Sequence, residues 1–242
     1  MTAMPKLGGI WVYLAATPLL GLTITLLAYL IAQALYAKAR FNPLANPVLI
    51  AVALLVTLLE VTGTPYATYF EGAQFVHFLL GPATVALAVP LYENRKAAAA
   101  AILPMLAALV VGSATAIFSV MLLAEAAGLP RVVVLSLAPK SVTAGVAMGI
   151  SESLHADPSL AAVAVVITGI MGAIVVTPLM NRLGITDFRA RGFAVGIAAH
   201  GIGTARAFQV DAVAGVFASI AMSLNALLTS FLVPLAATLL LR

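Results

Sequence analysis

The chain has 242 residues, of which 63% are hydrophobic and only 8% are charged, with a formal net charge of +4 and no cysteine. Soluble domains carry about 25% charged residues, so a chain this apolar is expected to lie in lipid. The missing cysteines exclude disulfides, thiolate metal sites and cysteine nucleophiles. The basic residues stand in short loops between apolar runs, as in the cytoplasmic loops of membrane proteins, so we expect no nucleic-acid partner.

Apolar runs of about 20 residues, the length that crosses a bilayer, follow one another along the whole chain. They are rich in Ala and Leu and lack strand-like alternation, so the expected fold class is all-α. The sequence predicts one membrane domain, residues 1–242, built as a polytopic helix bundle of about seven or eight membrane segments. The segments are predicted at 10–36, 48–61, 75–92, 97–124, 132–150, 160–180, 193–208 and 212–241.

Three of these segments are interrupted by proline or glycine: 75–92 by Gly81-Pro82, 132–150 by Pro139 and Gly145, and 193–208 by Gly201 and Gly203. Proline removes a helical hydrogen bond and glycine loosens the backbone. In lipid, freed backbone groups are tolerated only where protein or a water-filled cavity covers them. Interrupted segments are the best sequence pointer to the binding site of a transporter, so we expect discontinuous or re-entrant helices around a cavity.

Two of the interruptions share a pattern. Gly81-Pro82-Ala83-Thr84 and Gly201-Ile202-Gly203-Thr204 are both G-x-x-T, offset by 120 residues, and Thr17-Pro18 matches Ala138-Pro139 at nearly the same offset. These matches suggest a two-fold internal repeat with halves at 1–126 and 127–242. They are few, so repeat and coincidence both stay open.

Charge placement predicts the topology, because basic loops of membrane proteins face the cytoplasm. The basic clusters are Lys38 with Arg40, Arg95 with Lys96, and Arg182 with Arg189 and Arg191. The last cluster is cytoplasmic only if two of the segments 97–124, 132–150 and 160–180 cross fully. The segment 132–150 carries Pro139-Lys140 at its middle and is predicted to be a re-entrant hairpin, which places Glu152 and Asp157 outside.

Two cations, Lys140 and Arg206, stand inside apolar segments, where a charge costs at least about 2.5–3.5 kcal/mol. No acidic residue lies in the same runs, so an anionic ligand is the expected counter-charge. Arg pairs with a carboxylate through a planar fork and Lys acts as a point charge. The substrate-binding candidates that would complete the hydrogen bonding are the hydroxyls of Ser141, Thr143, Thr204 and Thr84. The alternative is that both cations reach an interface or pair with Glu152 or Asp211.

Three histidines are scattered along the chain. His200, directly before its G-x-x-T turn, is also a substrate-binding candidate and could relay protons, since the unperturbed pKa of histidine is about 6.5. The alternative for His77 and His200 is a core histidine bonded to the backbone, and His155 lies in a polar stretch. Neither a metal-ligand pattern nor a nucleophile motif occurs, so we expect no metal, no cofactor and no enzymatic activity.

Two Asn-Pro pairs, Asn42-Pro43 and Asn46-Pro47, precede the segment 48–61. Asn before Pro favours an extended or turn-like entry, so these pairs are predicted to cap that helix. A polar group at a cavity rim is the alternative.

Four motifs, in this order, are similar to those of the LrgB/CidB family. They are Asn46-Pro47-Val48-Leu49-Ile50, Gly81-Pro82-Ala83-Thr84-Val85-Ala86-Leu87-Ala88-Val89-Pro90-Leu91-Tyr92, Leu137-Ala138-Pro139-Lys140-Ser141-Val142-Thr143 and Ala199-His200-Gly201-Ile202-Gly203-Thr204-Ala205-Arg206. The resemblance covers nearly the whole chain. Two departures stand out: Ala144-Gly145 replaces the usual Thr-Pro after the third motif, and Ala199 replaces a frequent Ser before His200.

The resemblance implies one of two functions. Some members resemble carboxylate transporters for pyruvate or for glycolate and glycerate, which agrees with the anion site expected at Lys140 and Arg206. We therefore rank transport of small organic acid anions, such as pyruvate, lactate or glycolate, first. Other members are called antiholin-like and are associated with a small LrgA/CidA-type holin-like partner, murein hydrolase export and autolysis. Either implies a multi-pass protein of a bacterial cytoplasmic (inner) membrane, and we expect a homo-oligomer, a dimer, or a complex with such a partner.

Overall fold

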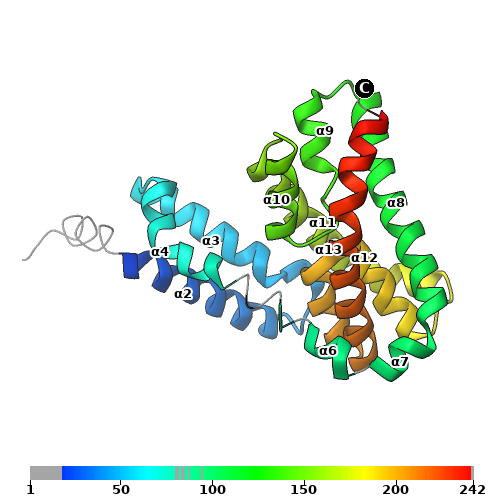
Figure 1. Ribbon diagram of the computed structural model, residues 1–242. Helices are drawn as coiled ribbons and strands as arrows, with labels where there is room; N and C mark the ends of the chain where they lie inside the picture. The colour runs from blue at the N-terminus through cyan, green and yellow to red at the C-terminus, as the bar shows by residue number, and fades with distance from the viewer. Residues whose placement is uncertain (1–17, 80–81, 83–84, 87, 94, 241–242) are drawn as a thin grey trace, which may run out of the picture. The chain divides into compact units, whose positions relative to one another are not determined.

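The computed structural model of the chain describes residues 18–79, 82, 85–86, 88–93 and 95–240. Every regular element in these residues is a helix, which confirms the expected all-α class of a polytopic membrane protein. The chain divides into two compact units, Met1–Thr84 and Val85–Arg242 (Figure 1). The single domain and the repeat halves at 1–126 and 127–242 stay predictions. Thr17, Gly81 and Thr84, on which the repeat depends, lie outside the described residues.

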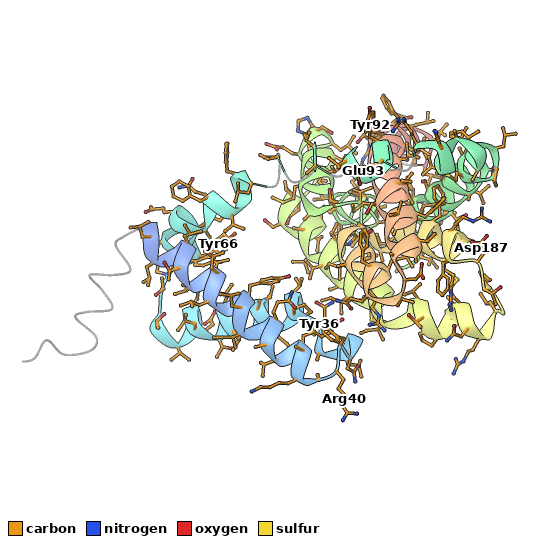
Figure 2. The ribbon with its side chains drawn as sticks, turned by 90° about the horizontal axis from the view of Figure 1, so that it is seen from below. Tyr36, Arg40, Tyr66, Tyr92, Glu93 and Asp187 are labelled. Atoms are coloured by element: carbon orange, nitrogen blue, oxygen red, sulfur yellow. The ribbon has the colours of Figure 1, made fainter. Side chains whose placement is uncertain are left out.

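The first unit contains α2 (Pro18–Lys38), the short 3-10 helix η1 (Pro43–Ala45), α3 (Pro47–Thr62) and α4 (Tyr66–Phe78). Helix α2 packs against both α3 and α4. Small residues, among them Ala32 and Ala51, form the contact between α2 and α3. The side-chain oxygen of Asn46 accepts hydrogen bonds from the N–H groups of Val48 and Leu49, so the predicted cap is confirmed. Figure 2 labels Tyr36 and Arg40, near the end of α2.

The second unit is the larger one. In chain order it contains α6 (Ala88–Glu93), α7 (Arg95–Ala100), α8 (Ile102–Ala126), α9 (Arg131–Leu137), α10 (Ala144–Ser153), α11 (Pro158–Arg182), α12 (Phe188–Val210) and α13 (Ala212–Leu240). Among the described residues, four helices are long and apolar enough to cross a membrane: α2, α8, α11 and α13. Three of these four therefore belong to the second unit.

Two apolar clusters show how the long helices of the second unit run. Met121 near the end of α8, Val165 near the start of α11 and Val233 near the end of α13 belong to one cluster. Met105 near the start of α8 and Phe217 near the start of α13 belong to another. Helices α8 and α13 are therefore parallel, and α11 runs the opposite way. We call the end where α8 ends and α11 begins the α9 end, and the opposite end the α12 end.

The first hairpin comprises α9, α10 and the residues between them (131–153), and it enters from the α9 end. After α10 the chain returns to α9, because the Ser136 hydroxyl near the end of α9 accepts a hydrogen bond of 2.9 Å from the backbone N–H of Asp157, just before α11. Residues of both arms, including Val134 and Ala147, pack in the cluster at the α9 end. The predicted interruption of the segment 132–150 at Pro139 is thus confirmed, and the re-entry of this hairpin into the membrane from one face stays a prediction.

The second hairpin is α12 itself (188–210), and it enters from the α12 end. Its helical path is broken at Ala199 and His200, and His200 has φ +41° and ψ −137°, a conformation that is rare outside glycine. A straight helix would separate Phe188 from Val210 by about 33 Å. Both instead line one small cavity together with Ala214 at the start of α13, so the two halves of α12 lie side by side.

Close packing between small residues holds the second hairpin. A Cβ added at Gly192 or Gly196 would overlap the backbone carbonyls of Ala214 and Ala218 on α13. At Gly203 it would lie 2.6 Å from the Cβ of Ala199, in the other half of α12. The prediction that Gly201 and Gly203 form the break is therefore corrected: the chain breaks at Ala199 and His200, and Gly203 permits the close approach of the two halves.

Other predicted segments correspond to helices with shifted bounds. The segment predicted at 75–92 begins earlier, because α4 starts at Tyr66, and its last part corresponds to α6. The prediction excluded residues near Glu71, since it counted only charge-free runs. The helix predicted at 97–124 is α8, preceded by the separate helix α7, and the one predicted at 160–180 is α11.

Candidate functional site

The second unit contains a cavity of about 800 Å³ between α8, the first half of α12 and the tip of the first hairpin. It extends over about 22 Å of α8, from Ala101 to Ala116, at 1.5 Å per residue. Its lining residues are Ala101, Pro104, Met105, Ala108, Gly112, Thr115, Ala116, Lys140, Ser141, Asp187, Arg189, Ala190, Phe193, Ala194, Ile197, Ala198 and Phe217. Exposed Asp187 and Arg189 form its mouth at the α12 end, and Figure 2 shows Asp187 at the edge of this unit.

Lys140 and Ser141 stand at the inner end of the cavity, where the sequence predicted a binding site. They lie in the break between α9 and α10, which Pro139 helps to produce because it cannot donate a helical hydrogen bond. The Lys140 ammonium is half-buried and donates to the Ser141 hydroxyl at 3.4 Å. An amine and a hydroxyl therefore face the same space.

No carboxylate in the described part of the chain lies within salt-bridge distance of Lys140. The acid at the cavity mouth, Asp187, pairs with Arg189 at 2.7 Å. The hydrogen bonds from the Arg189 side chain and backbone hold the pKa of the Asp187 carboxyl at about 2, well below its usual value of 3.8. This carboxylate is charged and already paired at neutral pH, so it does not neutralise the inner cation.

The walls between mouth and inner end are mostly apolar. Phe193, Ile197 and Phe217 contribute large side chains, alanines contribute small ones, and Gly112 leaves room for the Ile197 side chain. Thr115 is exposed and lines the cavity near the inner end, and the sequence interpretation missed it. A small ligand with one acidic group and a short polar body matches this distribution of apolar walls and inner polar groups.

His200 and Thr204 lie away from the cavity lining. The His200 ring is buried, and its Nε2 is 2.9 Å from the Val165 carbonyl on α11. The Thr204 hydroxyl donates to the His200 carbonyl at 2.7 Å and lies 3.9 Å from the Met222 sulfur on α13. These contacts correspond to the alternative considered for His200, a core histidine bonded to the backbone.

The remaining predicted site residues are also dispersed. Arg206 is half-buried on the second half of α12, donates to Gln209 at 3.4 Å and does not line the cavity. Thr143 precedes α10 and makes no capping hydrogen bond with its side chain. Thr84 lies outside the described residues. Of the candidates, the structure thus brings Lys140 and Ser141 together in one cavity.

A buried amide that the sequence interpretation overlooked lies behind this inner end. Asn225, in the middle of α13, has only 1% of its surface exposed and donates to the backbone carbonyl of Ser141. A lone amide in a 29-residue apolar helix was the signal that could have found it, since polar groups inside membrane helices are rare. Among the described residues no group of three or more His, Asp or Glu side chains could hold a metal ion.

The helical fold and the four long apolar helices define a polytopic helical membrane protein. The model of the LrgB-like family matches residues 25–239, so the chain belongs to the LrgB family. It is 34% identical to the protein YwbG of Bacillus subtilis, over 87% of this chain and 93% of that one. It is 32% identical to the Holin-like protein CidB of Staphylococcus epidermidis, over 92% and 96%. The Holin-like protein CidB of Staphylococcus aureus is also 32% identical, over 89% and 94%. No solved structure matches the chain.

Proposed function

We propose that the chain transports small organic acid anions, such as pyruvate, lactate or glycolate, across the cytoplasmic membrane of a bacterium. One observation carries this proposal: Lys140 lines a cavity whose acidic lining residue, Asp187, is already paired with Arg189 at the mouth. A cation at membrane depth needs a partner, and a ligand carboxylate supplies one. The Ser141 hydroxyl lies 3.4 Å from this ammonium, and Thr115 also lines the cavity.

The paired hairpins support transport rather than catalysis. Discontinuous helices that meet near the middle of the membrane are typical of transporter binding sites. The cavity volume of about 800 Å³ lies within the usual range of about 300–1,000 Å³ for small-molecule sites. Its basic surroundings at the α12 end, Arg182 and Arg191, favour a cytoplasmic mouth. In the proposed state the cavity is open to the cytoplasm.

Assembly with other chains is part of the proposal. Large apolar side chains such as Leu103 on α8 and Phe231 on α13 are about three-quarters exposed, at 77% and 75%, and need a cover of lipid or protein. We expect a homodimer, or a complex with a small membrane protein of the LrgA/CidA type.

A second candidate is a holin-like or antiholin-like function, and the names of the CidB relatives favour it. In that function the chain acts through association with a holin-like partner and influences murein hydrolase export and autolysis. It requires no ligand at Lys140. The two candidates therefore differ in whether the inner cation is needed.

Uptake by reconstituted protein tests the proposal. The purified chain, alone and with its small partner, is placed in liposomes, and uptake of labelled pyruvate, lactate and glycolate is measured. Lys140→Ala is compared with Lys96→Ala, a matched change of an exposed lysine on α7 that does not line the cavity. Arg206→Ala tests the cation outside the cavity.

Saturable uptake that Lys140→Ala abolishes and Lys96→Ala leaves intact would support carboxylate transport. We expect a smaller loss for Arg206→Ala, because this side chain lies outside the cavity. Uptake that is unchanged by Lys140→Ala would contradict the proposed site. Absence of uptake under every condition, with folded protein and partner present, would favour the holin-like function.

A further inference from the structure

Asn225 connects both hairpins through a single side chain. Its Nδ2 group donates to the Ser141 carbonyl of the first hairpin at 3.2 Å and to the Ile197 carbonyl of the second at 3.0 Å. Its Oδ1 atom accepts from the Ser113 hydroxyl on α8 at 2.6 Å and from the Thr229 hydroxyl on α13 at 3.2 Å. Four different parts of the second unit therefore meet at this amide.

The two carbonyls need a donor because each lies where a helix is interrupted. The Ser141 carbonyl belongs to the break between α9 and α10. The Ile197 carbonyl lies two residues before the break at Ala199. In a continuous helix it would accept from the N–H group four residues ahead, but the break turns that group away. A buried carbonyl without a donor is costly, and a primary amide has two N–H groups, one for each carbonyl.

The same contact lies at the closed end of the cavity. Ser141 and Ile197 both line the cavity, as does Ala116, the lining residue of α8 farthest from the α12 end. Directly beyond, Ile117 of α8 and Val142 of the first hairpin are fully buried in the cluster at the α9 end. The cavity is thus open toward the α12 end and sealed toward the α9 end where the hairpin tips meet.

We propose that Asn225 is a positioning residue that latches the two hairpin tips together and so closes the cavity toward the α9 end. This inference rests on the proposed function in that it treats the cavity as a passage for a solute. Release of the Ser141 and Ile197 carbonyls lets the first hairpin separate from the second, and the cavity then opens toward the face that bears Glu152 and Asp157. The amide also sets the orientation of Ser141, beside the cation.

Asparagine at position 225 suits this role because its amide can donate to both carbonyls while accepting from hydroxyl groups. Leucine has a similar size but no donor, and aspartate keeps the shape and the acceptor but presents an oxygen to both carbonyls. Asn225→Leu and Asn225→Asp therefore remove the two tip hydrogen bonds in different ways. Ser230→Ala is the matched control, because its hydroxyl bonds within α13 on an exposed face.

Cysteine accessibility measures the latch directly, since the chain has no cysteine of its own. Ala116→Cys places one thiol at the inner end of the cavity, and its reaction with a membrane-impermeant thiol reagent is followed from each face. Intact cells expose one face and inverted vesicles the other. The readout is the ratio of the labelling rates from the two faces. A general loss of stability raises both rates, whereas opening at the α9 end raises one of them and so changes the ratio.

The expected result is fast labelling of Ala116→Cys from the α12 end and only slow labelling from the α9 end, in the parent and in the Ser230→Ala control. Both Asn225 variants should raise labelling from the α9 end by about tenfold, because two hydrogen bonds hold the closed arrangement. If one variant fails to give monodisperse protein, the other still decides. One-sided labelling in a folded Asn225 variant would overturn the latch and leave the transport proposal standing. Equally fast parent labelling from both faces would also overturn the latch. Labelling from neither face would contradict the cavity and both proposals.

Discussion

The two hairpins of the second unit share an architecture and differ in what their tips contain. The first hairpin presents Lys140 and Ser141 to a cavity, and its second arm, α10, carries Gly149 with no described atom within 4 Å of an added Cβ. The second hairpin buries its tip. Ala199 and His200 fit against Gly172 and Gly169 of α11, where an added Cβ would overlap them.

This difference indicates that the two hairpins have different functions. A tip that is buried between glycines has no room for a ligand, and a strained residue such as His200 persists only because its surroundings hold it. A tip that carries an amine and a hydroxyl into a cavity has the chemistry for binding. We infer that the second hairpin is scaffold and that the first hairpin contacts the ligand and moves.

The largest expected effect comes from a side chain at the base of the second hairpin. Gly192→Val forces a branched side chain into the Ala214 backbone and should destabilise the protein by about 3 kcal/mol or more, so that little folded protein accumulates. Gly145→Val, on the open face of the first hairpin, is the matched control. Folded yield is measured by size-exclusion chromatography in detergent. Equal yields for the two variants would remove the distinction between a packed and an open hairpin.

A smaller change probes the tip contact with α11. In Gly169→Ala the new methyl group lies 2.6 Å from Cε1 of His200, which should cost about 1–3 kcal/mol and lower the thermal midpoint. Gly149→Ala in the middle of α10 meets no described atom and should raise stability by up to about 1 kcal/mol, through helix propensity. Opposite shifts of the thermal midpoint in the two variants would show that the second hairpin is closely packed at its tip and that α10 has an open face. A neutral Gly169→Ala would show that the tip can retreat from α11.

The closing contact of the first hairpin should be weaker still. Ser136→Ala removes the acceptor for the Asp157 N–H and should cost about 1 kcal/mol, the net value of one hydrogen bond. Ser153→Ala changes a serine in the same hairpin whose hydroxyl bonds only locally, to Ile150, and should be neutral. Hydrogen exchange of the α9 and α10 amides is the measurement. Exchange that does not change in Ser136→Ala would argue against this contact as a stabiliser of the hairpin.

The smallest effect concerns pH at the mouth. The pKa of Asp187 is lowered to about 2, so the folded state favours the charged carboxylate. The stabilisation of the fold by this charge is therefore complete above the usual pKa of 3.8 and is lost only as the pH falls toward 2. Uptake profiles of the parent and of Asp187→Asn should therefore have the same shape between pH 5 and pH 8. Profiles that diverge in this range would show that Asp187 titrates there and is not held by Arg189.

Much of this architecture follows from local sequence. The apolar runs define α8, α11 and α13, and the proline and lysine at 139–140, together with the charge count, predict the first hairpin. The interruption of the second hairpin is also predictable, but its return to the α12 end is not. That depends on the contacts of Gly192 and Gly196 with α13, which no local pattern reveals.

The site was predictable in part for a related reason. An apolar run predicts that Lys140 and Arg206 lie at membrane depth, but it does not predict which side of a half-helix each occupies. The return of α12 turns Arg206 and Thr204 away from the space that Lys140 faces. Asn225 was detectable as a lone amide, but its role required the positions of both tips.

The measurement that tests the central claim most directly is the sidedness of single cysteines at the bases of the two hairpins. Leu129→Cys and Ser153→Cys flank the first hairpin, and Thr186→Cys and Gln209→Cys flank the second, all at exposed positions. Two re-entrant hairpins predict that impermeant reagents label the first pair from one face and the second pair from the other. If α9 and α10 crossed as one helix, their 23 residues would span about 34 Å, and Leu129 and Ser153 would react from opposite faces. That result would contradict the account.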